Sequence, residues 1–181
     1  GRRDHAAARR READRDHAIG FARIADAPAL AAMSRDLVEA GLGWEYRPER
    51  LARLIADANT VAVVARDIRR PVAFAVMTFG DERAHLVLLA VRPTHQRQGI
   101  ARRALAWLLG SAATAGIVSV HVELRVNNPA AYALYREAGF TETVRVPGYY
   151  RGREAAGRMI RVLPVPAGEW PAGRRQTPDR R

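Results

Sequence analysis

A short basic turn after an apolar segment holds the residues best suited to chemistry in this chain. The apolar segment covers 84–91, and a helix is expected to begin at Gly99, just after the turn. Backbone N–H groups at a helix N-terminus, with arginines such as Arg97 and Arg102 beside them, can hold a phosphate or pyrophosphate. Glycine lets such a ligand approach the backbone because it has no Cβ. The turn therefore predicts an anion-binding site.

Two common phosphate loops are excluded by the residues present. The chain has no G-x-G-x-x-G and no G-x-x-x-x-G-K-[ST] segment, and it contains no lysine. The pattern in the turn is instead Gln96-x-x-Gly99-x-Ala101. A helical apolar stripe follows it, formed by Ile100, Ala104, Leu105, Leu108 and Ala112.

Three segments together resemble the GNAT N-acetyltransferase superfamily. Gln96-x-x-Gly99-x-Ala101 is similar to its acetyl-CoA pyrophosphate loop, Q/R-x-x-G-x-G/A. Residues 122–140, VELRVNNPAAYALYREAGF, resemble the block E-x-R-x-x-N-x-x-A-x-x-L/F-Y-x-x-x-G-F, particularly in the RimI-like branch, which acetylates the N-terminal amine of a ribosomal protein. Residues 148–159, GYYRGREAAGRM, are similar to the Y-Y-x-x-x-G-R-E-D-A-x-x-M ending of that branch, without its Asp. The resemblance covers about 19–163.

The pattern of strands and helices predicts the order β–α–α–β–β–β–α–β–α–β–β. Strands are expected at 19–25, 60–66, 72–79, 84–91, 117–126, 140–146 and 156–163, and helices at 27–40, 49–57, 99–115 and 129–138. The resemblance implies the α/β fold of the GNAT acyl-CoA N-acyltransferases, a mixed, mostly antiparallel central sheet with helices on both faces. One domain is expected at 19–163, between disordered tails at 1–18 (Arg-rich) and 164–181 (Pro- and Arg-rich).

The resemblance also implies acetyl-CoA as co-substrate and a binding site for it. The strand end would contact the pantetheine, the turn would hold the pyrophosphate, and Asn128 would bind the pantetheine arm. An N–H near Val91 would polarise the thioester carbonyl. The expected contacts are Leu89, Ala90, Val91, Arg97, Gln98, Gly99, Ile100, Ala101, Arg102 and Asn128.

Glu123 and Tyr135 match the base and the acid of the RimI-like branch. By this resemblance Glu123 would take the proton of the amine, directly or through water, and Tyr135 would protonate the departing sulfur. Structural interpretations stay open for both. Glu123 lies on the polar face of an alternating strand, where a solvated carboxylate beside Arg125 is also ordinary. Tyr135 lies on the apolar stripe of its helix, where packing alone would explain it.

Other residues have both a functional and a structural interpretation. His121 shares the face of Glu123, and it is either a proton relay or a structural histidine. Two segments that would flank an acceptor in this fold carry aromatic residues, which either form the wall of the acceptor site or pack a hinge. These residues are Trp44, Tyr46, Tyr149 and Tyr150.

Composition limits the classes of function. The chain has 181 residues, no cysteine and five histidines without metal-ligand spacing, so we expect no disulfide and no metal. No apolar run is long enough to span a membrane. The net charge of +11 lies mainly within 19–163, and it would suit a polyanion such as CoA, nucleic acid or the ribosome, or be an ordinary solvated surface. We interpret the chain as a cytoplasmic bacterial enzyme.

The resemblance implies an acetyl-CoA-dependent N-acetyltransferase, an acyltransferase that moves an acetyl group to a primary amine. A peptide α-amine has a pKa of about 7.7–8.0 and is an easier acceptor than lysine at about 10.4, which favours a protein N-terminus. A small-molecule amine and a non-catalytic GNAT domain that senses CoA are the alternatives. A nucleic-acid-binding module is not favoured, because it would interleave aromatic residues with arginines on one face. The sequence indicates no membrane partner and no particular oligomeric state.

Overall fold

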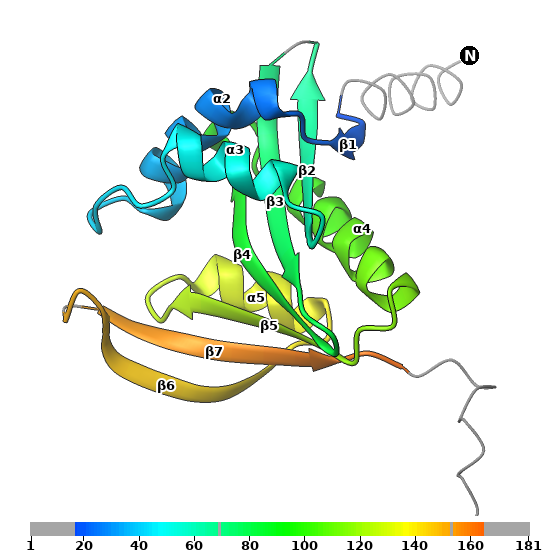
Figure 1. Ribbon diagram of the computed structural model, residues 1–181. Coiled ribbons are helices and arrows are strands. Elements are labelled where there is room, and N and C mark those ends of the chain that lie inside the picture. Colours follow the sequence, from blue (N-terminus) through cyan, green and yellow to red (C-terminus); the bar gives the residue numbers. More distant parts are fainter. Residues whose placement is uncertain (1–16, 69, 153, 165–181) are drawn as a thin grey trace, which may run out of the picture.

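The computed structural model describes residues 17–164, apart from 69 and 153 (Figure 1). Its strands are β1 (Ile19–Phe21), β2 (Thr60–Asp67), β3 (Arg70–Phe79), β4 (Arg83–Val91), β5 (Ser119–Arg125), β6 (Thr141–Tyr150) and β7 (Glu154–Val162). Its helices are α2 (Ala27–Met33), α3 (Pro48–Ala56), α4 (Ile100–Thr114) and α5 (Pro129–Glu137). Short helical turns are η1 (Ile24–Asp26), η2 (Ser34–Val38) and η3 (Pro93–His95). The expected order is confirmed, whereas the expected tails lie almost wholly outside the described residues.

The seven strands form one sheet in the order β1-β2-β3-β4-β5-β7-β6. Neighbouring strands are antiparallel except for β4 and β5, which are parallel and are connected through α4. In Figure 1, α2 and α3 cover one face of the sheet, and α4 and α5 cover the other. The fold is therefore the expected mixed, mostly antiparallel sheet with helices on both faces.

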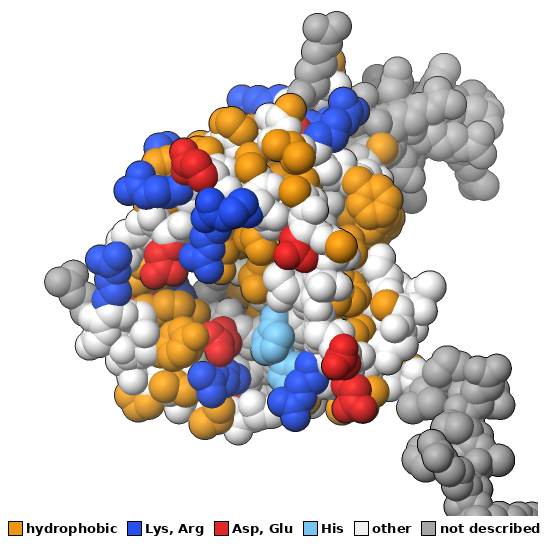
Figure 2. Space-filling model, in the orientation of Figure 1, with side chains coloured by type: hydrophobic (Ala, Val, Ile, Leu, Met, Phe, Trp, Pro, Cys, Tyr) orange, Lys and Arg blue, Asp and Glu red, His pale blue; other side chains and the backbone are white. Residues whose placement is uncertain are grey.

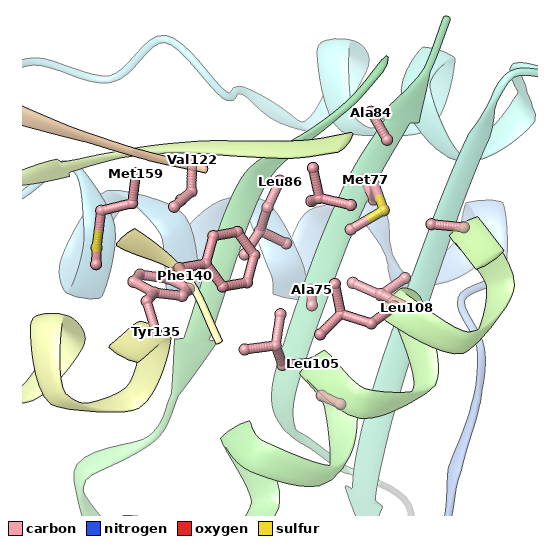
Figure 3. Packing of buried hydrophobic residues seen from close by; sticks show 14 of the residues in the cluster. Ala75, Met77, Ala84, Leu86, Leu105, Leu108, Val122, Tyr135, Phe140 and Met159 are labelled. Carbon is pink, nitrogen blue, oxygen red and sulfur yellow. The ribbon is translucent and has the colours of Figure 1, made fainter. Parts of the chain in front are cut away.

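Alternation along the central strands builds a core on each face of the sheet. On β2, Val63 packs with α4, while its neighbours Ala62 and Val64 pack with α2 and α3. Strand β3 divides in the same way, because successive side chains of a strand point to opposite faces. Figure 3 shows the core on the side of α4 and α5, where Tyr135 and Phe140 lie together near Val122 and Met159.

A β-bulge in β4 reverses which of its residues face each core. Leu86 pairs with Met77 and Leu88 pairs with Val76, so Val87 is an extra residue without a partner on β3. Leu86 packs on the side of α4 and α5, whereas Leu88, two residues further, packs with α2 and α3. Without the bulge both side chains would point to the same face.

Several element boundaries differ from the sequence-based expectations. Strand β1 is shorter than 19–25, because the Asp26 carboxylate accepts the Arg23 N–H at 2.8 Å and the chain turns into η1. The helix expected at 27–40 passes into the π-helical turn η2 at Ser34. Val118 falls within the strand expected at 117–126, but it precedes β5 and is 44% exposed. Strand β6 runs four residues past the expected end at 146.

Candidate functional site

The centre of the sheet opens at the position of Glu123. The parallel pairing of β4 with β5 begins at Arg83 opposite Ser119 and ends at Leu86 opposite Val122. Beyond that pair, β4 continues beside β3 alone, and β5 continues beside β7. Because the bulge at Val87 directly follows the last pair, it bends β4 where the strands separate. Glu123 is the first residue of β5 beyond this separation.

The turn between β4 and α4 has a backbone suited to an anion. Gly99 is left-handed with φ +77°, and Arg97 is left-handed as well, with φ +61°. No side chain caps α4, and its first turn contains no acidic residue. Among the described residues, the backbone N–H groups of 97–102 have no hydrogen-bond acceptor. The first hydrogen bond of the helix runs from the Arg103 N–H to the Gly99 carbonyl oxygen at 3.1 Å. Alternating handedness of this kind turns successive N–H groups toward one concavity.

The turn is held to the end of β4. The Gln96 side chain donates from Nε2 to the Val91 carbonyl oxygen at 3.1 Å. A Cβ added at Gly99 would meet nothing within 4 Å, so a ligand can approach the backbone there. Of the expected anion contacts, Arg97 is exposed, Ile100 is buried and serves packing, and Arg102 forms an ion pair with Glu137 of α5 at 2.8 Å.

Asn128 caps α5 and is exposed at its N-terminus. Its Oδ1 accepts the Ala131 N–H at 3.1 Å, as expected of an N-cap residue followed by Pro129. The cap uses the oxygen of the amide, so the amide N–H groups of Asn128 stay available to a ligand. Leu89, Ala90 and Val91 lie on the part of β4 that has separated from β5.

The Glu123 carboxylate has two partners. The Tyr149 hydroxyl on β6 donates a hydrogen bond to Oε2, and Arg158 on β7 donates from Nε to Oε1 at 3.0 Å. The Glu123 side chain is 38% exposed, so it stays accessible from solvent. The hydrogen bond to Glu123 raises the pKa of Tyr149 above its ordinary value, and burial adds to this effect. Glu123 is thus exposed to solvent, but its partners are Tyr149 and Arg158, whereas Arg125 pairs with Glu154.

Tyr135 and Glu123 lie on opposite faces of β5, with Tyr135 in the core beside Val122 and Leu124 and Glu123 on the exposed side. Tyr135 is 6% exposed and packs edge-on against Phe140, with ring centroids 5.5 Å apart. Burial raises the pKa of Tyr135 above its ordinary value, and the nearby Tyr150 adds to this effect. Burial, with a contribution from Glu123, raises the pKa of Tyr150 to about 12. Tyr150 thus lies within electrostatic reach of both residues, which β5 otherwise separates.

Two segments meet beside Glu123, the loop 39–47 and the β6–β7 turn at 148–152. Arg151 of the turn lies against Gly43 of the loop. Arg125, at the end of β5, donates from Nη2 to the Ala40 carbonyl oxygen at 2.8 Å. Burial raises the pKa of Tyr46, and Glu123 is among the charges that act on it. The structure therefore brings the two segments together beside Glu123, while Trp44 also donates to the Ala31 and Tyr46 carbonyl oxygens at 3.1 Å, so both interpretations of the aromatic residues stay open.

The loop 39–47 is organised by a buried carboxylate that the sequence analysis missed. Glu39 is 8% exposed, and its Oε1 accepts the N–H groups of Glu45 at 2.7 Å and of Tyr46 at 3.2 Å. The Ser34 hydroxyl donates to its Oε2 at 2.9 Å. The π-helical turn η2 makes this contact, since the Glu39 N–H bonds the Ser34 carbonyl oxygen five residues back.

His121 pairs with a second histidine rather than with Glu123. His85 and His121 are partners across β4 and β5, with ring centroids 5.3 Å apart. The His121 Nε2 lies 3.0 Å from the Ser119 hydroxyl. Burial lowers the pKa of His121, and the neighbouring His85 and Arg83 lower it further. These contacts favour the structural interpretation of this residue.

The part of the chain that the structure describes has neither a candidate metal site nor a membrane-spanning helix. No group of three or more His, Asp or Glu side chains there could hold a metal ion. No helix within 17–164 is long and apolar enough to cross a membrane. Concavities of about 540 Å³ beside Trp107 and about 250 Å³ beside Arg53 both lie away from Glu123. We therefore place the candidate site at the opening between β4 and β5.

Comparison with known proteins agrees with this geometry. The model of the Acetyltransferase (GNAT) family matches residues 30–140. The chain belongs to the GNAT acetyltransferase family. This GNAT chain is 37% identical over 99 residues to the "[Ribosomal protein bS18]-alanine N-acetyltransferase" of Salmonella typhimurium, covering 53% of this chain and 66% of the relative. The matched segment thus spans just under two thirds of that relative, and 64% of the corresponding Escherichia coli protein.

Solved GNAT structures share the fold over most of the chain. The crystal structure of the ribosomal-protein-S18-alanine N-acetyltransferase from Escherichia coli superposes with a TM-score of 0.73 and 26% identity, covering 86% of this chain and 97% of that one. Arabidopsis thaliana NAA60 in complex with acetyl-CoA has a TM-score of 0.71, with 15% identity and 80% and 97% coverage. The second likeness concerns the fold alone.

Proposed function

We propose that this chain is an N-acetyltransferase that moves the acetyl group of acetyl-CoA to the N-terminal α-amine of a protein. The observation that carries the proposal is the opening between β4 and β5. It begins at Glu123, and Tyr135 is buried in the core on the other face of β5. The backbone turn around Gly99 supports a pyrophosphate site at the end of β4, and the loop 39–47 supports an acceptor site beside Glu123.

The names of the relatives support the choice of donor and acceptor. The Salmonella and Escherichia coli proteins are named for transfer to an alanine of ribosomal protein bS18, and NAA60 was solved with acetyl-CoA. The named bS18 relatives are bacterial, which supports a bacterial cytoplasmic enzyme. An α-amine also loses its proton more easily than a lysine side chain, so it needs less help from a base.

In the proposed reaction, acetyl-CoA supplies a thioester whose carbonyl carbon is attacked by the amine. The N–H groups of 97–102 hold the pyrophosphate, the end of β4 from Leu89 to Val91 and Asn128 hold the pantetheine, and an N–H near Val91 polarises the carbonyl. Glu123 accepts the proton that the amine loses, directly or through water. As the C–N bond forms and the C–S bond breaks, the Tyr135 hydroxyl gives its proton to the sulfur, so that CoA leaves as a thiol.

The proposal is tested by following CoA release from acetyl-CoA with peptides, lysine side chains, polyamines and other small amines as acceptors. Mass spectrometry then locates the acetyl group. We expect acetylation of peptide α-amines, with kcat lowered about 100-fold or more in Tyr135→Phe and in Glu123→Gln, the range typical of general acid–base catalysis.

Each variant has a matched control in the same part of the fold. Tyr132→Phe removes a hydroxyl from a buried tyrosine one turn earlier in α5, and Glu142→Gln removes a carboxylate of β6 that pairs with Arg145. Both controls should keep the wild-type rate. Transfer to small amines alone would replace the proposed acceptor, whereas acetyl-CoA binding without transfer to any amine would indicate a non-catalytic CoA-binding domain.

A further inference from the structure

The acceptor end of the site, formed by the loop 39–47 and the β6–β7 turn at 148–152, is rich in arginine. Figure 2 shows Arg side chains on both sides of the hollow that separates the helices from the β6–β7 hairpin on this face. These arginines lie on or beside the loop 39–47 and the turn 148–152, which meet where Arg151 lies against Gly43. An acceptor that reaches Glu123 from solvent on this face passes between these two segments.

Each aromatic residue of the acceptor end has a guanidinium over its ring. Arg47 lies 4.8 Å and Arg35 5.2 Å from the ring centre of Trp44. The other pairs are Arg50 over Tyr46 at 4.3 Å, Arg158 over Tyr149 at 5.7 Å and Arg125 over Tyr150 at 6.0 Å. A guanidinium stacked on an aromatic ring keeps its N–H edges free for an anion.

Acidic side chains offset only part of the positive charge of this region, because two of its arginines have no acidic partner among the described residues. Arg35, Arg50, Arg125 and Arg158 have carboxylate partners in Asp36, Glu45, Glu154 and Glu123, at 2.8, 3.8, 3.5 and 3.0 Å respectively. Among the described residues, Arg47 and Arg151 have no acidic partner. Both are exposed, one on each of the two segments. The remaining buried carboxylate, Glu39, is already hydrogen-bonded to the loop.

This distribution of charge acts on the acceptor in two ways. Positive charge disfavours a protonated amine, so it promotes the neutral form that attack on the thioester requires. It also repels acceptors that carry further positive charge and attracts those that carry carboxylates near the amine. A carboxylate of the acceptor would give Arg47 and Arg151 the acidic partners that they lack among the described residues.

We propose that the acceptor is an anionic amine, namely a peptide N-terminus followed directly by Asp or Glu residues, and that Arg47 and Arg151 select it. This inference rests on the proposed function, because it names the acceptor class of the same site. Free glutamate presents the same chemistry, an amine close to carboxylates, in a small molecule.

The test compares three peptides that share an N-terminal alanine and differ only in the next two residues: Glu-Glu, Gln-Gln or Arg-Arg. We expect kcat/KM to be at least about 10-fold higher for the acidic than for the basic peptide at low salt, with the neutral peptide between them. The ratio should shrink toward one in 1 M salt, where the Debye length is about 3 Å. Free glutamate and spermidine form the small-molecule arms of the same assay.

Variants assign the preference to the two arginines. Arg47→Gln with Arg151→Gln should bring the ratio of acidic to basic peptide close to one. Arg53→Gln is the matched control, since it removes an exposed arginine from α3 that lies over no aromatic ring and should keep the wild-type ratio. A preference that survives the double variant would show that these residues do not select the acceptor.

The outcomes separate this inference from the proposed function. Equal rates with the three peptides, or a preference for the basic one, overturn the inference and leave the transferase intact. Preference for free glutamate over the acidic peptide keeps the anionic class and replaces the peptide by a small molecule. If acetyl-CoA binds but no acceptor of any charge is acetylated, the proposed function fails and the inference fails with it.

Discussion

Glu123 and Arg158 lie directly opposite each other on β5 and β7, and their side chains form an ion pair of 3.0 Å. The register of the two strands makes this pair, because side chains opposite each other in an antiparallel pair project to the same face. The Tyr149 hydroxyl bonds the other carboxylate oxygen, and the Arg158 guanidinium lies over the Tyr149 ring. The proposed base is therefore held in one orientation before any substrate arrives.

Replacing Arg158 tests the importance of this orientation. In Arg158→Gln the Glu123 carboxylate loses one of its two partners, so we expect kcat to fall about 10-fold through misplacement of the base. The KM for acetyl-CoA should stay unchanged. Arg145→Gln, which breaks the Arg145–Glu142 pair at 2.9 Å on β6, is the control. An unchanged kcat in Arg158→Gln would mean that Tyr149 alone positions the carboxylate.

Gly99 at the start of α4 and Gly110 inside the helix provide a matched pair of glycines. Gly99→Ala adds a Cβ to a left-handed residue and to the backbone proposed to hold the pyrophosphate. We expect a loss of about 1–2 kcal/mol in the free energy of unfolding and an acetyl-CoA KM raised several-fold. Gly110→Ala lies in the helix with nothing within 4 Å and should stabilise the protein by up to about 1 kcal/mol. Titration calorimetry with CoA and urea unfolding separate the two effects, and equal CoA affinity in both variants would contradict the proposed site.

Glu39 is expected to matter for the acceptor rather than for the donor. In Glu39→Gln an amide N–H group of the side chain would face either the N–H donors of the loop or the Ser34 hydroxyl, so a hydrogen bond would be lost. We expect the free energy of unfolding to fall by about 1–3 kcal/mol. Because the disturbed loop carries Trp44 and Tyr46, the KM for the acceptor should rise while the KM for acetyl-CoA does not. Glu82→Gln is the control, since it changes an exposed glutamate in the turn before β4, outside the loop 39–47. Parallel changes in both KM values would count against a local role.

Asp26 makes stability depend on pH in a defined direction. Arg66 donates to both of its oxygens, at 2.8 and 2.6 Å, and these hydrogen bonds hold the pKa of Asp26 below its ordinary value of 3.8, although burial opposes them. A lowered pKa in the folded state means that the stabilisation is complete above pH 3.8 and is lost as the pH falls through the folded value. We expect Asp26→Asn to cost about 1 kcal/mol at pH 7.

The difference in the free energy of unfolding between wild type and Asp26→Asn should disappear at the most acidic pH values at which both proteins stay folded. Urea unfolding at several pH values between 7 and 2.5 measures it. Asp36→Asn is the control, because the ion pair of Asp36 with Arg35 is largely exposed and should contribute little. A difference that is constant across this range would exclude titration of Asp26 as the cause.

The elements with regular hydrophobic periods were predicted from the sequence. The stripe from Ile100 to Ala112 is buried as expected, and the alternation around Glu123 gave the correct face for each residue of β5. Asn128 followed by proline is a combination typical of a helix start, and Asn128 caps α5. Periodicity works at these positions because one face of each element is buried and the other is solvated.

Three features of the structure could not be predicted from the sequence, each for a physical reason. Leu86 to Leu89 are all apolar, so no alternation marks Val87 as a bulge. Glu39 looks like a surface carboxylate in the sequence, because its partners are mainly backbone groups of a later loop. Pro147 suggested the end of a strand, yet β6 lies at the edge of the sheet, where the missing N–H of a proline can be tolerated.

The single extra residue at Val87 has a consequence for how this site can change. The aromatic and arginine side chains around the opening can be substituted one at a time, and each substitution would change the acceptor preference or the reaction rate. The opening itself depends on the number of residues in β4, since removing Val87 would make Leu86 and Leu88 neighbours in a regular strand and remove the bend where β4 leaves β5. Point mutations can therefore change the side chains of the proposed site, whereas a change in the length of β4 would alter the opening itself.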